Sequence, residues 1–190
     1  MTDSVHRVAL IIGSTREGRF GPTVARWLHS QVRARGDMEA DLIDLADAGL
    51  EQAFARAEPS AVASLGARLH AADAFLIVTP EYNHGYPAPL KTAIDWYQTQ
   101  WHAKPVGFVS YGGISGGLRA VEQLRQVFAE LHATTVRDAV SFPNAWEQFD
   151  ERGELLEQER YARRASVMLE RLLWWSEALR AARRKRAYPA

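Results

Sequence analysis

Residues 74–91 read AFLIVTPEYNHGYPAPLK, and the order of these parts is the strongest fold signal in the chain. The apolar run 74–78 predicts a strand buried on both faces, because consecutive non-polar residues leave no side for solvent. A Pro-Glu-Tyr-Asn loop follows, and Pro87 and Pro89 then open a helix at positions where their missing amides cost little. Open α/β proteins bind flat ligands at the carboxyl ends of such strands. The stretch therefore predicts an α/β fold with a ligand site at this edge.

Composition and charge narrow the class of protein. The chain has 190 residues, of which 47% are hydrophobic, enough for one domain with a sizeable core. Its 23 Lys and Arg residues equal its 23 Asp and Glu residues, so net charge favours neither nucleic acid nor a membrane surface as partner. The absence of cysteine excludes disulfides and thiolate sites. No apolar run approaches about 18 residues and no signal-peptide pattern opens the chain, so we expect a cytoplasmic protein without a membrane span.

Apolar patterns predict five strands that alternate with five helices. The strands fall at residues 8–12, 38–45, 73–78, 105–111 and 134–142, and the helices at 22–35, 60–72, 87–101, 117–132 and 155–184. Such alternation predicts a parallel sheet with helices on both faces, and the short connections suit the strand order 2-1-3-4-5. Residues 46–59 are expected to be loop with a short helical piece, and 144–153 a polar segment. We expect a single domain over residues 1–190.

The loop GSTREGRFG, residues 13–21, has the composition of a phosphate site. A phosphate monoester needs several hydrogen-bond donors in a concave loop with positive charge, and the start of the following helix adds unpaired amides. The loop supplies hydroxyls from Ser14 and Thr15, charge from Arg16 and Arg19, and glycines at 13, 18 and 21 that let amides turn inward. The spacing matches neither the dinucleotide fingerprint nor the ATP-type P-loop. An ordinary strand-to-helix turn with solvated arginines is the alternative.

Two further loops have the character of a cradle for a planar ring. Residues 80–86, PEYNHGY, combine prolines that restrict the backbone, Gly85 with access to positive φ, and flat surfaces from Tyr82 and Tyr86, which suits an isoalloxazine. Residues 110–117, SYGGISGG, follow the next buried strand and offer bare backbone amides. The alternatives are a proline-rich turn for the first loop and a flexible crossover for the second.

Together, GSTREGRFGP, TPEYNHGYPAPLKTAIDW and SYGGISGG resemble the NAD(P)H-dependent FMN reductase family of flavodoxin-like proteins, which includes quinone, azo-dye and chromate reductases. The resemblance runs from about Val8 to about Val140. It implies a flavodoxin-like, three-layer αβα fold with a five-stranded parallel sheet, FMN as cofactor and NADPH or NADH as reductant. It also implies a small-molecule electron acceptor, such as a quinone, free flavin or azo compound, and a homo-oligomer, either a dimer or a tetramer.

The resemblance further implies a set of FMN-binding residues. Those around the phosphate are Ser14, Arg16, Arg19, Phe20 and Gly21. Those along the isoalloxazine, largely through main chain, are Pro80, Glu81, Tyr82 and Asn83, and those at its other edge are Ser110, Tyr111, Gly112 and Gly113. No catalytic proton-transfer residue is expected, because the cofactor carries the hydride chemistry. The expected walls of the acceptor cleft are Tyr82, His84 and Trp101.

Other features have structural explanations that stay open beside the functional ones. The six histidines are too scattered in sequence for a metal site, and Asp95 is expected to be a surface carboxylate. The basic run at 180–186 suits a nucleic-acid or lipid partner, and a solvated end of the last helix is the stronger alternative. With Trp174 and Trp175, the last helix has more large apolar side chains than one helical face can bury, and this excess indicates a subunit interface. A flavodoxin-type electron carrier and a flavin-binding sensor without turnover are the competing functions.

Overall fold

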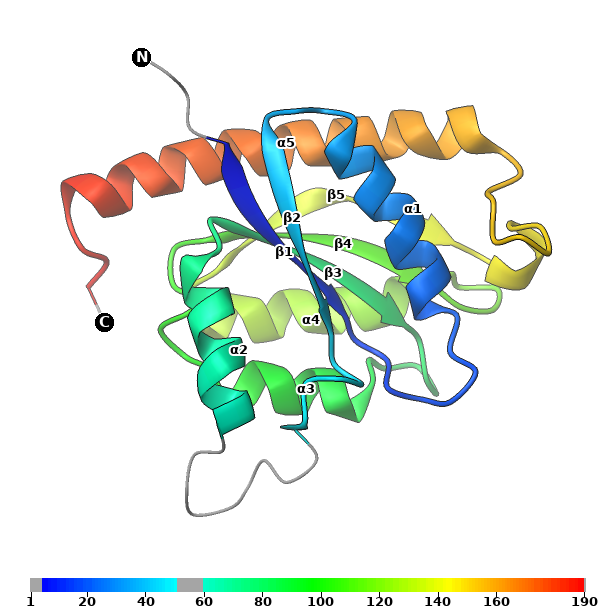
Figure 1. Cartoon of the computed structure of the whole chain (residues 1–190), viewed down its shortest axis with the longest axis horizontal. Helices are drawn as coiled ribbons and strands as arrows, with labels where there is room; N and C mark the ends of the chain where they lie inside the picture. The colour runs from blue at the N-terminus through cyan, green and yellow to red at the C-terminus, as the bar shows by residue number, and fades with distance from the viewer. Residues whose placement is uncertain (1–4, 51–59, 190) are drawn as a thin grey trace.

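A computed structural model describes residues 5–50 and 60–189, which form a five-stranded sheet between two layers of helices (Figure 1). The strands are β1 (His6–Ile12), β2 (Met38–Asp44), β3 (Ala74–Pro80), β4 (Pro105–Tyr111) and β5 (Thr134–Phe142). Every neighbouring pair is parallel, and the order is β2-β1-β3-β4-β5. The predicted flavodoxin-like, three-layer fold and its strand order are confirmed.

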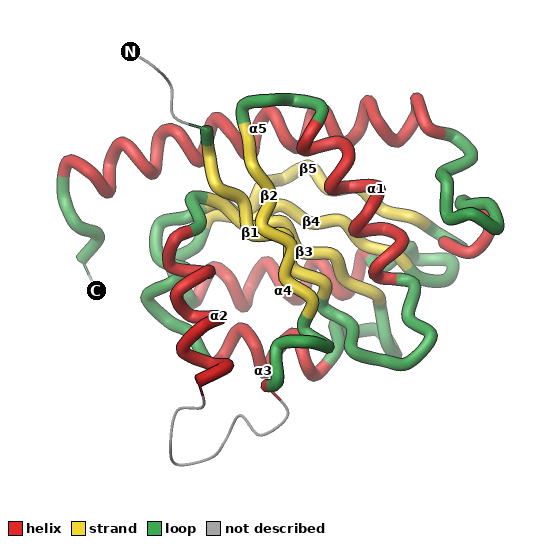
Figure 2. The backbone as a smooth tube through the Cα atoms, in the orientation of Figure 1, coloured by secondary structure: helices red, strands yellow, loops and turns green. Residues whose placement is uncertain are grey.

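The central strands contribute side chains to two separate cores, because successive residues of a strand point to opposite faces. Val8, Leu10 and Leu76 belong to the core shared with α1 (Gly21–Arg33) and α5 (Gln158–Lys185). Ile11 and Ile77 belong to the core shared with α2 (Ser60–Ala71), α3 (Ala88–Asp95) and α4 (Leu118–Glu130). Figure 2 shows the strands running between these two helical layers. Among the described helices, none has the length and hydropathy required to cross a bilayer.

Most element boundaries lie close to the predicted ones. Strands β4 and β5 have the predicted bounds, and the other boundaries differ by at most three residues, apart from the end of α3. A short helical piece is expected somewhere within 46–59, and most of that range, residues 51–59, lies outside the described residues. Residues 45–47 form a turn directly after β2.

Helix α3 is shorter than the sequence pattern predicts. It ends at Asp95, whereas the prediction continued it to about Trp101. The Trp101 indole Nε1 donates to the carbonyls of Ile94 and Tyr97 at 3.2 and 2.9 Å, so the ring folds back over the helix end and satisfies its last carbonyls. Only 1% of Trp101 is exposed. Trp101 is a core residue, and its predicted place in the acceptor cleft is wrong.

One lysine is buried at the amino end of the sheet. Lys104 lies just before β4, and its Nζ donates to the carbonyls of Leu69 and His70, both at 2.9 Å. These carbonyls belong to the last turn of α2 and have no partner inside the helix, so the ammonium caps them. Burial, helped by the positive charge of Arg183, lowers the pKa of Lys104 to about 8.

The substitution Lys104→Met is expected to remove a pH-dependent part of the stability. An unfolded lysine keeps its proton up to about pH 10.4, whereas folded Lys104 loses it near pH 8. Between those pH values the unfolded state binds more protons, so wild-type stability rises with pH. The rise from this group is roughly 3 kcal/mol, and the variant should lack it.

Urea unfolding between about pH 7.5 and 10.5 measures this difference. Lys185→Met, at an exposed position, is the matched control and should retain the wild-type rise. A Lys104→Met profile that runs parallel to wild type would contradict the assignment.

Candidate functional site

Four loops meet at the carboxyl edge of the sheet. They follow β1, β3, β4 and β5, which are consecutive neighbours in the sheet. The strand ends are in register, with Pro80 beside Tyr111 and Tyr111 beside Phe142. Three of the loops are those predicted from the sequence to carry chemistry. The fourth, residues 143–147, includes the short 3₁₀ helix η2 (Ala145–Glu147), where the sequence indicates only a polar segment.

The first loop carries hydrogen-bond donors that the described part of the chain does not use. Ser14 is fully buried, and its Oγ lies 2.6 Å from the Tyr82 hydroxyl of the second loop. The backbone amides of residues 15–18 have no hydrogen-bond partner among the described residues. The amino end of α1 follows directly and adds the positive end of its dipole. The loop therefore holds a run of unpaired donors beside a helix start.

The two arginines of this loop lie in different environments. Nη2 of Arg19 lies 2.7 Å from Oδ2 of Asp44 at the end of β2, and both side chains are mostly buried. Nε of Arg19 is also buried, with no hydrogen-bond partner among the described residues. Arg16 is exposed and forms no ion pair within the described ranges. Arg16 thus offers an uncompensated charge, and Arg19 offers one buried donor.

Close packing at the start of α1 requires glycine at position 21. A Cβ on Gly21 would lie 2.9 Å from both Cγ2 of Ile12 and the hydroxyl oxygen of Tyr111, closer than packed atoms tolerate. That hydroxyl is buried and has no hydrogen-bond partner in the described part of the chain. Burial raises the pKa of Tyr111 well above its ordinary value, so the phenol keeps its proton. An unpaired buried donor is what a site completed by a ligand would contain.

The second loop is a tight two-residue turn. The amide of Tyr82 donates to the carbonyl of Gly85 at 2.9 Å, and the reverse bond is 3.1 Å. Asn83 and His84 between them have φ of 49° and 75°, the left-handed pattern of a type I′ turn. The prediction that Gly85 supplies the positive φ is wrong, because the residues with positive φ in this turn are Asn83 and His84. Gly85 is needed for space instead, since a Cβ there would lie 3.2 Å from the Gln123 side chain.

The Glu81 side chain braces the second loop against α4. With 5% exposure, its carboxylate accepts hydrogen bonds from Nε of Arg119 at 2.6 Å and from the Arg119 amide at 3.1 Å, at the start of the helix. Burial raises the pKa of Glu81, but hydrogen bonds from Arg119 and Ser115 outweigh burial and leave the pKa below its ordinary value. Glu81 is therefore ionised, and its carboxylate is already bound by Arg119. Arg119 is a positioning residue that the sequence analysis missed.

The third loop folds onto its own strand through two glycines. Gly116 and Gly117 have φ of 59° and 85°, and a Cβ on Gly117 would lie 2.7 Å from Cβ of Ser110. The hydroxyls of Ser110 and Ser141 both donate to the Gly116 carbonyl, at 2.7 and 2.9 Å. The Ser110 hydroxyl is thus used inside the loop, and its contribution is to fix the loop's shape.

The fourth loop is joined to the third through backbone hydrogen bonds. The amide of Gly112 donates to the carbonyl of Phe142 at 3.3 Å, and the carbonyl of Gly112 accepts from Ala145 at 3.1 Å. Gly113 is exposed, and a Cβ there would lie 3.9 Å from the ring of Trp146, which is itself 62% exposed. The sequence analysis missed Trp146, because a lone tryptophan in a polar segment carries no pattern.

Comparison with known proteins identifies the family. The family model for NADPH-dependent FMN reductase matches residues 6–147. The chain belongs to this family. An NAD(P)H-dependent FMN reductase of Schizosaccharomyces pombe is 32% identical over 148 residues, which cover 72% of this chain and 74% of the relative. A quinone reductase of Escherichia coli strain K12 is 37% identical over 135 residues, covering 67% and 71% of the two chains.

A solved structure agrees with this membership. The flavoenzyme NAD(P)H:(acceptor) oxidoreductase from Paracoccus denitrificans superposes with a TM-score of 0.66 at 27% identity, covering 92% of this chain and 98% of its own. This member of the NADPH-dependent FMN reductase family is therefore an oxidoreductase with FMN as cofactor and NAD(P)H as reductant. Membership in a reductase family favours turnover over the carrier and sensor alternatives.

The substitution His84→Gly is expected to stabilise the protein by about 0.5–1 kcal/mol, because a residue with a Cβ is disfavoured in the left-handed region and glycine is not. His84→Val should destabilise it, since a β-branched residue tolerates that region least. Both variants keep the backbone carbonyl that accepts from Gln123 at 2.9 Å. Chemical denaturation compares the two free energies of unfolding, and shifts of the same sign would contradict the strain assigned to this turn.

Proposed function

We propose that this enzyme binds FMN at the carboxyl edge of the sheet and uses NAD(P)H to reduce a small acceptor, a quinone or free flavin. One observation carries the placement: unpaired donors from neighbouring loops converge there, namely the amides of residues 15–18 and the buried hydroxyl of Tyr111. A phosphate and its attached chain offer the acceptor oxygens that such donors need. The relatives named FMN reductase and quinone reductase support the acceptor class.

The phosphate end of FMN fits the first loop. The hydroxyls of Ser14 and Tyr82 share a hydrogen bond of 2.6 Å, which holds Ser14 in place beside the proposed phosphate position. Arg16 adds the uncompensated charge, and Arg19 adds its buried Nε. The Arg19 amide already donates to the carbonyl of Arg16 at 3.2 Å. The further main-chain donors that we propose, after those of residues 15–18, are therefore the amides of Phe20 and Gly21. Asp44 holds Arg19 in place for this task.

The isoalloxazine end fits the second and third loops, and the hydrogen bonds within them narrow the set of donors. The amides of Glu81 and Tyr82 already bind protein carbonyls, which leaves the amide of Asn83. In the third loop the amide of Gly112 is occupied and that of Gly113 has no partner among the described residues. We therefore assign the ring's main-chain hydrogen bonds to Asn83 and Gly113, with Pro80, Ser110 and Tyr111 shaping the cradle.

FMN held in this cradle would supply the hydride chemistry between NAD(P)H and the acceptor. The residues of the chain bind and orient the ring, and no proton-transfer side chain is required of them. Tyr82, His84 and Trp146 border the open side of the loops and form the proposed wall of the acceptor cleft. Trp146 takes the place first assigned to Trp101.

A homodimer through α5 is the proposed assembly. Trp174 and Trp175 are 61% and 37% exposed, with ring centroids 5.1 Å apart at 89°, so the helix presents a broad aromatic surface away from its own core. Trp174→Ser is expected to raise the dimer dissociation constant at least about thirtyfold, the loss typical of a buried aromatic anchor. Sedimentation velocity measures it, with Leu42→Ser as control, and a wild-type monomer at micromolar concentration would refute the dimer.

The FMN-loaded, desalted protein is expected to keep the flavin absorbance and to lose it when NADPH or NADH is added without oxygen. A quinone added afterwards should restore the absorbance. Retained flavin that neither reductant bleaches would contradict the proposed reaction.

Arg16→Gln extends the same experiment to the binding residues. The variant is expected to bind FMN about tenfold more weakly, because one charge-assisted hydrogen bond is lost, and to bind riboflavin, which has no phosphate, as wild type does. Fluorescence titration measures both affinities, with Arg163→Gln as the control at an exposed position on α5. An equal loss for FMN and riboflavin would show that Arg16 acts on the loop and not on the phosphate.

A further inference from the structure

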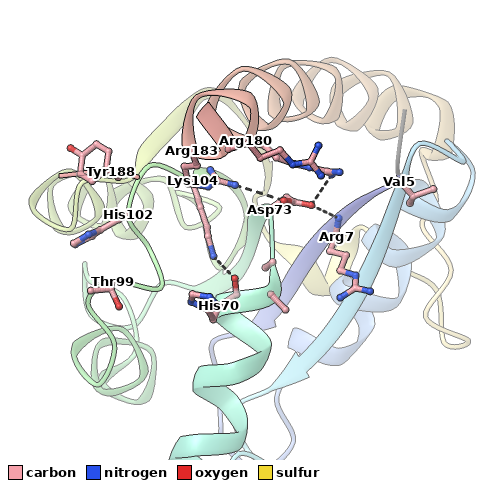
Figure 3. A pocket seen from close by; sticks show the side chains of 13 residues that line it. Val5, Arg7, His70, Asp73, Thr99, His102, Lys104, Arg180, Arg183 and Tyr188 are labelled. Carbon is pink, nitrogen blue, oxygen red and sulfur yellow. Dashed lines mark hydrogen bonds and ion pairs between the residues drawn. The ribbon is translucent and has the colours of Figure 1, made fainter. Parts of the chain in front are cut away.

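A large cavity lies at the amino edge of the sheet, opposite the flavin loops (Figure 3). Its volume is about 720 Å³, and it is bounded by β1, the end of α2 with the two residues before β3, the segment before β4 and the last turns of α5. Its charged lining residues, besides two histidines, are Arg7, Asp73, Lys104, Arg180, Arg183 and Arg184. Among the described residues, five cations therefore face one carboxylate, although the whole chain has no net charge.

The single carboxylate is already shared. Oδ2 of Asp73 lies 3.0 Å from Nη1 of Arg180 and accepts from the backbone amide of Arg7 at 3.2 Å. Its Oδ1 lies 3.7 Å from Nη2 of Arg183. Arg183 also donates to the carbonyl of Ala103. Asp73 thus ties the end of α5 to β1 and cannot neutralise the remaining cations.

Two guanidinium groups of the cavity have no structural task. Arg7 and Arg184 are exposed, and neither side chain forms an ion pair or hydrogen bond with a described residue. In Figure 3 the Arg7 side chain points away from Asp73, although its backbone binds that residue. Removing both side chains should therefore leave the fold unchanged.

The positive potential acts on the neighbouring groups. The pKa of Lys104 is lowered to about 8, first by burial and then by Arg183. The pKa of His6 is lowered as well, first by burial and then by Arg180. The smaller, electrostatic part of each shift has the sign expected beside uncompensated cations, and a bound anion would oppose it.

We propose that this cavity binds a small phosphorylated anion with at least two phosphate groups. Two unpaired guanidiniums in one concave site suit two phosphates, because each planar fork can bind a phosphate in a bidentate way. The rings of His102 and Tyr188, 5.7 Å apart, add a flat wall on one side. A strand of seven residues spans about 20 Å, so a ligand here cannot reach the carboxyl edge. The site is therefore separate from hydride transfer.

Isothermal titration of the FMN-saturated protein with inorganic pyrophosphate, at about 0.15 M salt, tests the proposal. Saturation with FMN keeps the probe out of the proposed flavin phosphate site. Wild type is expected to bind one pyrophosphate per chain, and the double variant Arg7→Ser with Arg184→Ser is expected to bind it at least about tenfold more weakly. A control double variant, Arg137→Ser with Arg163→Ser, removes the same charge at positions where the side chains are 91% and 74% exposed.

The outcomes separate a built site from general attraction. The proposal is supported if only the double variant Arg7→Ser with Arg184→Ser loses affinity for pyrophosphate. Equal loss in both double variants, or no pyrophosphate binding by wild type at millimolar concentration, overturns it. The single variant Arg184→Ser, in the last turn of α5, should show a partial loss of pyrophosphate affinity with a thermal midpoint no lower than that of wild type. If FMN itself fails to bind, the proposed flavin site is wrong, but the pyrophosphate titration can still be made. The substitutions at Arg7 and Arg184 then still test the cavity alone, because both residues lie at the amino edge of the sheet.

Discussion

The burial of three strands on both faces is the constraint from which the rest of the architecture follows. In β3 and β4 every residue is buried, and in β1 only Arg7 is exposed. Such strands have no solvent face, so they must pair with one another and be covered by helices on both sides. Parallel pairing then puts every strand end that leads into a loop at one edge. The loops that follow β1, β3 and β4 are neighbours for this reason, whatever their own sequences are.

Within that edge, most polar side chains hold the loops to one another. Ser14 binds Tyr82, Glu81 binds Arg119 on α4, and Ser110 binds the Gly116 carbonyl. What is left for a ligand is mainly backbone, together with the buried hydroxyl of Tyr111, the buried Nε of Arg19 and the exposed Arg16. A site built in this way is rigid before the ligand arrives, which reduces the entropy that binding must overcome.

The sequence predicted those parts of the molecule that depend on neighbours in the chain. Apolar runs identified all five strands, and the glycine and proline patterns located three loops of the site. The end of α3 was missed because Trp101 reaches back to Ile94 and Tyr97, a side-chain cap without a periodic signal. Residues 143–147 were missed because their role depends on backbone bonds to Gly112, whose partner cannot be inferred from composition.

The cluster of cations at the amino edge of the sheet could not be predicted from the sequence, because its residues come from segments near opposite ends of the chain. Cations near a helix carboxyl end stabilise its carbonyls, and this accounts for Lys104 at the end of α2. Ion pairs account for part of the basic run at the end of α5, because Arg180 and Arg183 bind Asp73. Neither explanation accounts for Arg7, which lies on a strand, lines the same cavity and leaves its guanidinium unpaired among the described residues. Like charges gathered without compensation raise the free energy of the folded state. An anion bound in the cavity would offset that cost, and this is the physical reason to assign the cavity to an anion and not to the helix ends alone.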